Sequence, residues 1–176
     1  GVFDQYFTLS DLKYIHDRLR FSVKELLRSH SKDGLIYNDK LETWMDTCFK
    51  DNDYQADFRE GFRIEIQAMF LNMLRLMNML DELFANKLIK KSDKLHRIIE
   101  NDIDFTILEK NMVDIVRKSF LFNVNGRWVL NDGFNSGYHD VVRPNIFLAF
   151  YIYKDMLTDA EWKDVEKNDD DTESEE

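Results

Sequence analysis

The chain has 176 residues and a formal net charge of −10, with 44% hydrophobic and 14% aromatic residues. This composition belongs to a chain that folds around a core and excludes an intrinsically disordered one. One proline and six glycines are too few for a turn-rich β-sandwich and favour long helices. The single cysteine, Cys48, excludes an intrachain disulfide and a cysteine-cluster metal site.

The acidic charge is concentrated at the C-terminal end of the chain. Residues 163–176 hold eight acidic side chains and two lysines, so the remainder is only mildly acidic. We therefore expect two units, a domain over residues 1–162 and a solvated acidic tail over residues 163–176. Nucleic-acid binding requires a basic patch, and none is evident, so no nucleic-acid partner is expected.

No membrane partner is expected either. The most apolar stretch, residues 64–84, is interrupted by polar and charged side chains, which predicts a buried helix of a soluble protein. Residues 1–13 show no pattern of a signal or transit peptide. Together with the single cysteine, this favours a cytoplasmic protein.

The first predicted element is a helix over residues 8–29. Thr8 and Asp11 have the spacing of a capping box. One face of this helix is apolar, through Leu12, Ile15, Leu19, Val23 and Leu26. Residues 34–61 then form a long, polar, irregular segment, and loops of that length in compact domains are usually functional.

The second predicted helix, residues 62–84, is apolar on nearly every side. Such a helix is expected at the centre of a bundle. A weaker helix is predicted over residues 92–100. Thr106 and Glu109 have the spacing of a second capping box, which opens an amphipathic helix that ends near residue 120.

The C-terminal third is predicted to contain a short strand over residues 124–130, with a turn at Gly126. Pro144 suits the first position of a helix that continues through residues 146–156. Thr158 and Glu161 are predicted to cap a final short helix. These five or six helices make the chain all-α.

Three motifs occur in order along the polar stretches and the helices that follow them. They are Thr43-Trp44-Met45-Asp46, then Arg63-Ile64-Glu65-Ile66-Gln67-Ala68 at the start of the central helix, then Arg143-Pro144-Asn145 after Asp140. Over roughly residues 10–165 the chain resembles the glucosidase domain of glycogen-debranching enzymes, the amylo-α-1,6-glucosidases. The resemblance implies an (α/α)6 barrel similar to that of glucoamylases, with a sugar pocket built from loops at one end.

The length of the chain indicates that this barrel is incomplete. Twelve helices with their connections need roughly 200 residues as a minimum, and the chain has 176 with long loops among them. We therefore expect part of the barrel. The resemblance also implies that the catalytic base lies beyond the last residue of the chain.

Asp46 is the predicted catalytic residue. Glycoside hydrolysis needs two carboxyl groups, one of which protonates the leaving oxygen. The resemblance implies that Asp46 is this general acid, and the neighbouring Trp44 and Met45 would raise its pKa by desolvation. The structural alternative is an aspartate that caps a loop turn.

Glu65, Gln67 and Asn72 are predicted to contact the substrate from the central helix. Glu65 either accepts hydrogen bonds from sugar hydroxyls or only interacts with the helix dipole. Asn72 lies within about 20° of Glu65 around the helix axis, and a polar stripe on a buried helix needs partners. Gln67 lies on a different side and shares the site only if the start of the helix faces the pocket.

Trp44, Arg143 and Asn145 complete the predicted substrate site. Trp44 is expected to stack on a glucose ring, with a core tryptophan as the alternative. Arg143 and Asn145 either contact sugar or a catalytic carboxylate, or form a capped helix start with a salt bridge to Asp140. The four histidines show no metal spacing, and the glycines form no phosphate loop, so no cofactor and no metal are expected.

The expected function is hydrolysis of the single α-1,6-linked glucose at a branch stub of glycogen or a similar α-glucan, with inversion. One alternative is a non-catalytic helical module that needs a second chain or segment to complete the barrel. Another is a different (α/α)6 glycosidase of trehalase or glucoamylase type.

Overall fold

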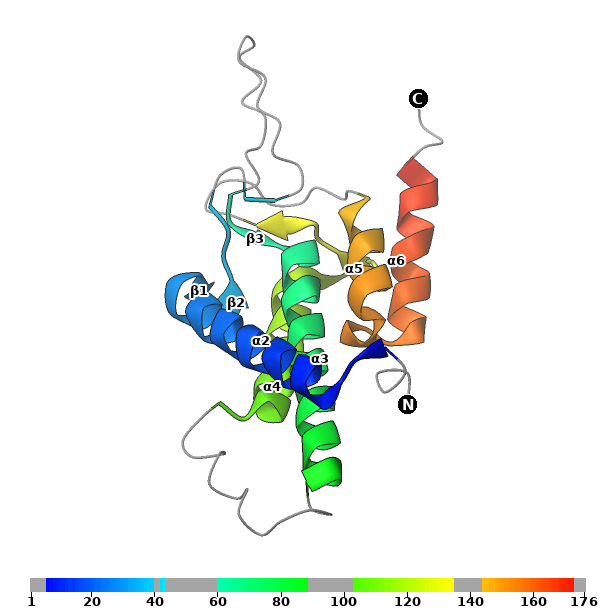
Figure 1. Ribbon diagram of the computed structural model, residues 1–176. Helices are drawn as coiled ribbons and strands as arrows, with labels where there is room; N and C mark the ends of the chain where they lie inside the picture. The colour runs from blue at the N-terminus through cyan, green and yellow to red at the C-terminus, as the bar shows by residue number, and fades with distance from the viewer. Residues whose placement is uncertain (1–5, 40–41, 44–59, 89–102, 135–143, 173–176) are drawn as a thin grey trace.

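The computed structural model describes residues 6–39, 42–43, 60–88, 103–134 and 144–172 (Figure 1). Its helices are α2 (Leu9–Ser29), α3 (Ile64–Leu88), α4 (Phe105–Phe120), α5 (Asn145–Tyr153) and α6 (Asp159–Thr172), with a 3-10 turn at Lys154–Met156. The described part of the chain is mainly helical, which confirms the all-α expectation. None of its helices combines the length and apolarity needed to cross a membrane.

Three short antiparallel strand pairs join the helices. They are β1 (Ser31–Lys32) with β2 (Leu35–Ile36), β3 (Phe62–Arg63) with β6 (Gly133–Phe134), and β4 (Leu121–Val124) with β5 (Arg127–Leu130). The strand predicted over residues 124–130 is therefore a hairpin. Its turn has positive φ angles at Asn125 (52°) and Gly126 (85°), as the tight turns between twisted strands require.

Helix α3 is the centre of the fold, as its apolar composition predicts. It contacts α2, α4 and α5, and α2 crosses it in Figure 1. Its fully buried residues are spread around most of the helix: Ile64, Ala68, Leu71, Leu74, Met77 and Leu80. Met69, Asn72 and Met79 form a narrow exposed stripe, and near the other end of the helix Asp81, Glu82 and Ala85 are also exposed.

The N-terminal capping box of α2 is confirmed. The Asp11 backbone N–H donates to Thr8 Oγ1 at 3.2 Å, and Thr8 N donates back to the Asp11 carboxylate at 2.9 Å. Leu12 and Val23 from the predicted apolar face are buried in the core. His16 joins α2 to α3 through a 2.7 Å hydrogen bond between its Nε2 and Asp81 Oδ1.

The capping box predicted for Thr106 and Glu109 is wrong. Asp104 caps α4 instead, because its carboxylate accepts hydrogen bonds from the backbone N–H groups of Thr106 and Ile107, both at 3.0 Å. Thr106 lies within the first turn, and its hydroxyl donates to Asn78 Oδ1 of α3 at 3.2 Å. The predicted helix over residues 92–100 lies outside the described residues.

The last two helices differ from the prediction in their ends. The helix expected through residue 156 stops at Tyr153 and continues as the 3-10 turn. The capping box of Thr158 and Glu161 is confirmed, with Thr158 N donating to Glu161 Oε2 at 2.7 Å. Helix α6 then runs through Thr172 with Val165 in the core, so the boundary expected between residues 162 and 163 falls inside a helix.

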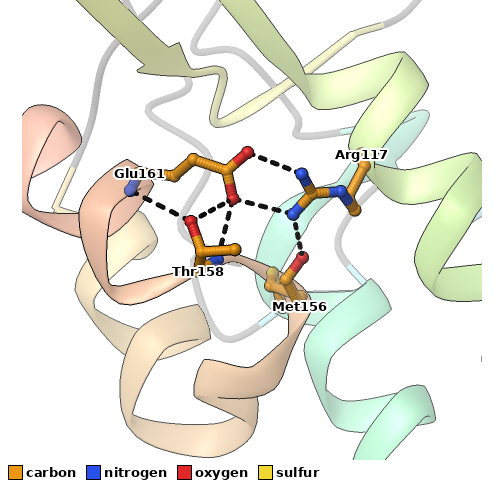
Figure 2. Close-up of polar contacts among 4 residues, drawn as sticks. All are labelled: Arg117, Met156, Thr158 and Glu161. Carbon is orange, nitrogen blue, oxygen red and sulfur yellow. Dashed lines mark hydrogen bonds and ion pairs between the residues drawn. The ribbon is translucent and has the colours of Figure 1, made fainter.

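An ion pair joins α4 to α6 (Figure 2). Arg117 donates from Nη2 to Glu161 Oε1 at 2.5 Å and from Nη1 to Glu161 Oε2 at 2.8 Å. The same Nη1 donates to the carbonyl oxygen of Met156 at 3.2 Å. The Glu161 carboxylate thus caps its own helix and holds α4 at the same time.

Candidate functional site

A cluster of buried polar side chains lies where α3 and α5 begin. Arg63 Nη1 lies 3.8 Å from Asp132 Oδ2, and these two side chains are only 3% and 2% exposed. Asn145 Nδ2 donates to the other Asp132 oxygen, Oδ1, at 2.7 Å. Arg63 also donates from Nη2 to the carbonyl of Glu60 at 2.9 Å. Burial of an ion pair requires such additional hydrogen bonds.

The pairing of β3 with β6 puts Arg63 and Asp132 together. Arg63 faces Gly133 across the strand pair, and Ile64 N donates to the Asp132 carbonyl at 2.9 Å. A Cβ at Gly133 would lie 2.4 Å from the Phe62 carbonyl and 2.6 Å from Arg63 Cδ. The lack of a side chain at Gly133 therefore leaves the room that Arg63 occupies.

Gln67 has a structural contact that the sequence did not indicate. Its Oε1 accepts from Ile36 N at 2.8 Å, and its Nε2 donates to Ile36 O at 2.7 Å. The same Nε2 donates to Arg63 O at 3.1 Å. The Gln67 amide thus satisfies both backbone groups of Ile36, as a neighbouring strand would, and holds β2 against the first turn of α3.

Glu65 and Asn72 lie on the same side of α3 but in different surroundings. Glu65 is 1% exposed and belongs to the buried end of the helix, whereas Asn72, two turns later, is exposed. Asn72 is therefore not buried as Glu65 is. Asn145, at the start of α5, belongs to the buried polar cluster.

Trp44, Asp46 and Arg143 lie outside the described residues. The structure does describe the residues at which the segments carrying them begin and end. Asn38 and Gly61 exchange backbone hydrogen bonds of 3.0 and 2.9 Å, so residues 39–60 leave and rejoin the fold at one place. The Asp132–Asn145 bond does the same for residues 135–143.

These two segments are attached to one framework. Gly61 immediately precedes β3, and β3 pairs with β6, which precedes residue 135. In Figure 1, β3 and the first turns of α3 and α5 lie at the same end of the molecule. The segment that carries Trp44 and Asp46 and the segment that carries Arg143 therefore both start from the buried cluster.

Tyr37 and Glu60 stabilise the first of these attachment points. The Tyr37 hydroxyl donates to Glu60 Oε1 at 2.8 Å, and this hydrogen bond, with burial, raises the pKa of Tyr37 to about 12. The Tyr37 ring also packs edge-on against Phe62 of β3, with 5.5 Å between ring centres. The phenol remains protonated at physiological pH and keeps its donor.

Sequence reasoning missed Arg63 and Asp132 as members of the cluster. Arg63 stands in the motif at the start of α3, but its position before the helix gave no sign of burial. Asp132 precedes Gly133 and has the pattern of an ordinary turn. The sequence did offer one indication. Arg63 and Asp132 each adjoin an apolar stretch, and opposite charges in such positions are candidates for a buried ion pair.

An open apolar hollow adjoins the cluster at the start of α5. It is lined by Pro144, Asn145, Phe147 and Leu148. Asn145 thus borders the hollow while its amide is held by Asp132.

The chain matches a known protein family. Residues 6–171 match the family model described as amylo-alpha-1,6-glucosidase. No curated protein and no solved structure shows significant similarity to the chain.

Proposed function

Because this chain belongs to the amylo-alpha-1,6-glucosidase family, we propose that it supplies the acid-bearing part of a domain that removes single α-1,6-linked glucose residues from branch stubs of glycogen or a similar α-glucan. The proposed architecture is part of an (α/α)6 barrel with its sugar pocket at the end where α3 and α5 begin. The coarser role, a glycosidase domain related to glucan debranching, follows from the family.

One observation carries this proposal. The segments with the Thr-Trp-Met-Asp and Arg-Pro-Asn motifs are attached to the same buried framework of Arg63, Asp132 and Asn145. A glycosidase needs its acid and its sugar-binding groups around one bond, and loops from a rigid framework provide that arrangement. The convergence of the attachment points supports a common site for both motifs.

In the proposed mechanism Asp46 protonates the oxygen of the α-1,6 bond as it breaks. A second carboxylate, roughly 6.5–9.5 Å from the first, activates the water that attacks from the opposite face and inverts the anomeric carbon. Trp44 stacks on the glucose ring, and Arg143 and Asn145 bind its hydroxyls. Glu65, which is buried in α3, is the proposed further carboxylate of the pocket. It would accept hydrogen bonds from sugar hydroxyls or orient Arg143 by its charge.

The experiment is a glucose-release assay with the complete domain, which also supplies the catalytic base, on a limit dextrin whose branches end in single α-1,6-linked glucose. Proton NMR of the first turnovers should show β-glucose, because inversion of an α-linkage yields the β-anomer. A linear α-1,4-glucan of equal length is the matched control substrate and should release little glucose. Initial release of α-glucose would contradict the inverting mechanism, and equal release from the linear glucan would contradict the linkage.

A second candidate is a non-catalytic module that needs another chain or segment. It is favoured by α5, which is apolar on nearly every side yet exposes Phe147, Leu148 and Tyr151, the last at 87%. Patches of this kind normally drive association. The family match favours debranching over a trehalase-like or glucoamylase-like activity. We also propose a cytoplasmic location, in keeping with the single cysteine.

Sedimentation velocity separates the two candidates. If the exposed apolar surface of α5 binds another chain or segment, the isolated chain should self-associate or aggregate, and Tyr151→Ser should weaken that association. A monodisperse monomer that melts cooperatively would contradict the second candidate.

A further inference from the structure

Three side chains at the C-terminal end of α2 offer metal ligands. His30, Asp39 and Glu42 place one ligand atom each within 4.8 Å of the others, and His30 Nε2 lies 3.7 Å from Glu42 Oε2. Ligand atoms around a zinc-sized ion at about 2.0–2.2 Å lie roughly 3–4 Å apart. We propose that these residues form a binding site for a divalent transition-metal ion.

The hydrogen bonds of His30 leave the correct nitrogen available. Ser29 Oγ donates its proton to the Glu25 carbonyl at 2.6 Å. It must therefore accept the 2.7 Å hydrogen bond from His30 Nδ1. The proton of the neutral ring is held on Nδ1, and the lone pair of Nε2 faces Glu42. Metal-binding histidines in proteins are commonly oriented by such a bond from their second ring nitrogen.

The charge around the three residues attracts a cation. Asp39 and Glu42 contribute two carboxylates, and His30 is the C-cap of α2, where the helix dipole is negative. The Asp39 backbone N–H donates to Glu42 Oε2 at 2.7 Å and fixes the orientation of that carboxylate. One imidazole with two carboxylates favours Zn²⁺, Co²⁺ or Mn²⁺ over Mg²⁺ and Ca²⁺, which prefer oxygen ligands alone.

A cation here would fasten the first long segment near its start. Asp39 follows the Asn38–Gly61 bridge, and Glu42 precedes the buried Thr43 of the Thr-Trp-Met-Asp motif. The ion would join both residues to the end of α2. This inference rests on His30, Asp39 and Glu42 and does not depend on the proposed glycosidase activity.

The test is a titration of the full chain with Co²⁺, followed by its visible absorption and by calorimetry. We expect one ion per chain, with a spectrum typical of mixed nitrogen and oxygen ligands. His30→Gln and Glu42→Gln should weaken binding by more than about 100-fold, and Ser29→Ala should weaken it by about 10- to 100-fold. Melting temperature should rise with added Co²⁺ in the unmodified chain and not in His30→Gln.

Two control variants separate this site from incidental binding. Glu166→Gln removes an exposed carboxylate of α6, and His96→Gln removes a different histidine. Both should bind Co²⁺ as the unmodified chain does, and circular dichroism verifies that every variant is folded. Failure of the unmodified chain to bind Co²⁺, or equal binding by His30→Gln, would overturn the proposal. Glucan hydrolysis is not part of the readout, so its absence leaves this result unaffected.

Discussion

Asn145 donates a 2.7 Å hydrogen bond to Asp132, 13 residues earlier in the chain, and so closes the segment between β6 and α5. The same aspartate faces Arg63 of β3. One buried carboxylate therefore connects the start of α5 with the strand that leads into α3. The following predictions test what this framework and the other interhelix contacts contribute.

Asp132→Asn should destabilise the fold strongly. It removes the charge that faces the buried Arg63 guanidinium, and loss of one partner of a buried ion pair costs about 3–5 kcal/mol. Urea unfolding measures the change in free energy. Glu82→Gln, the same kind of change at an exposed position of α3, should alter stability by less than about 0.5 kcal/mol. Equal stability of the two variants would show that Asp132 does not hold the framework.

Gln67→Leu tests whether this glutamine serves the fold or the substrate. Leucine is similar in size but leaves the N–H and carbonyl of Ile36 without their side-chain partner. Each buried backbone group left unsatisfied costs about 1–3 kcal/mol, so with two such groups we expect a loss of about 2–6 kcal/mol in urea unfolding. A variant with unchanged stability but a raised KM for a branched glucan would instead assign Gln67 to substrate binding.

The Arg117–Glu161 pair should make stability depend on acid pH. Its hydrogen bonds lower the pKa of Glu161 from 4.5 to about 2. Because the folded pKa is the lower one, this stabilisation is complete above pH 4.5 and is lost as the pH falls toward 2. Glu161→Gln should lose about 3 kcal/mol at pH 7 and show a flatter decline between pH 5 and 2. Identical pH profiles would contradict this role.

His16 should give the opposite pH dependence. Its hydrogen bond to Asp81 raises its pKa above 6.5, so the stabilisation is complete below pH 6.5 and is lost as the pH rises through the folded value. Hydrogen exchange of α2 amides should become faster between pH 6 and 9, after correction for the intrinsic rate. His16→Gln keeps a hydrogen-bond donor but does not titrate, and should remove this dependence. If the dependence persists, another group controls the attachment of α2.

Asp46→Asn tests the proposed general acid. The test uses the full-length enzyme, which supplies the catalytic base. Asparagine is nearly isosteric, so glucan binding should persist, but turnover should fall by about 10²–10⁴-fold. The loss should be smaller for glucosyl fluoride, whose leaving group needs no protonation. Equal losses on both substrates with reduced stability would indicate a structural aspartate. Full activity on the branched glucan would remove Asp46 from the mechanism.

Local sequence patterns predicted most helices but not the contacts between them. The capping boxes at Thr8 and Thr158 were recognisable because each involves residues three apart. Asp104 was missed as the cap of α4 because Thr106 offered an equally good local pattern. The contacts of Gln67 with Ile36 and of Asp132 with Asn145 join distant positions, and single-residue patterns carry no information about such pairings. Thus Asn145 was selected by motif, while the Arg63–Asp132 pair that it contacts was not.

The Asn38–Gly61 bridge and the Asp132–Asn145 bond have a consequence for loop length. Each fixes both ends of a segment that carries a motif, so the ends stay together whatever the number of residues between them. The entropy of closing a loop grows only with the logarithm of its length, about 0.6 kcal/mol for each doubling. Insertions or deletions within residues 47–59 should therefore leave the helices undisturbed. The proposed sugar pocket can therefore change shape through the lengths of these segments without loss of the helical framework.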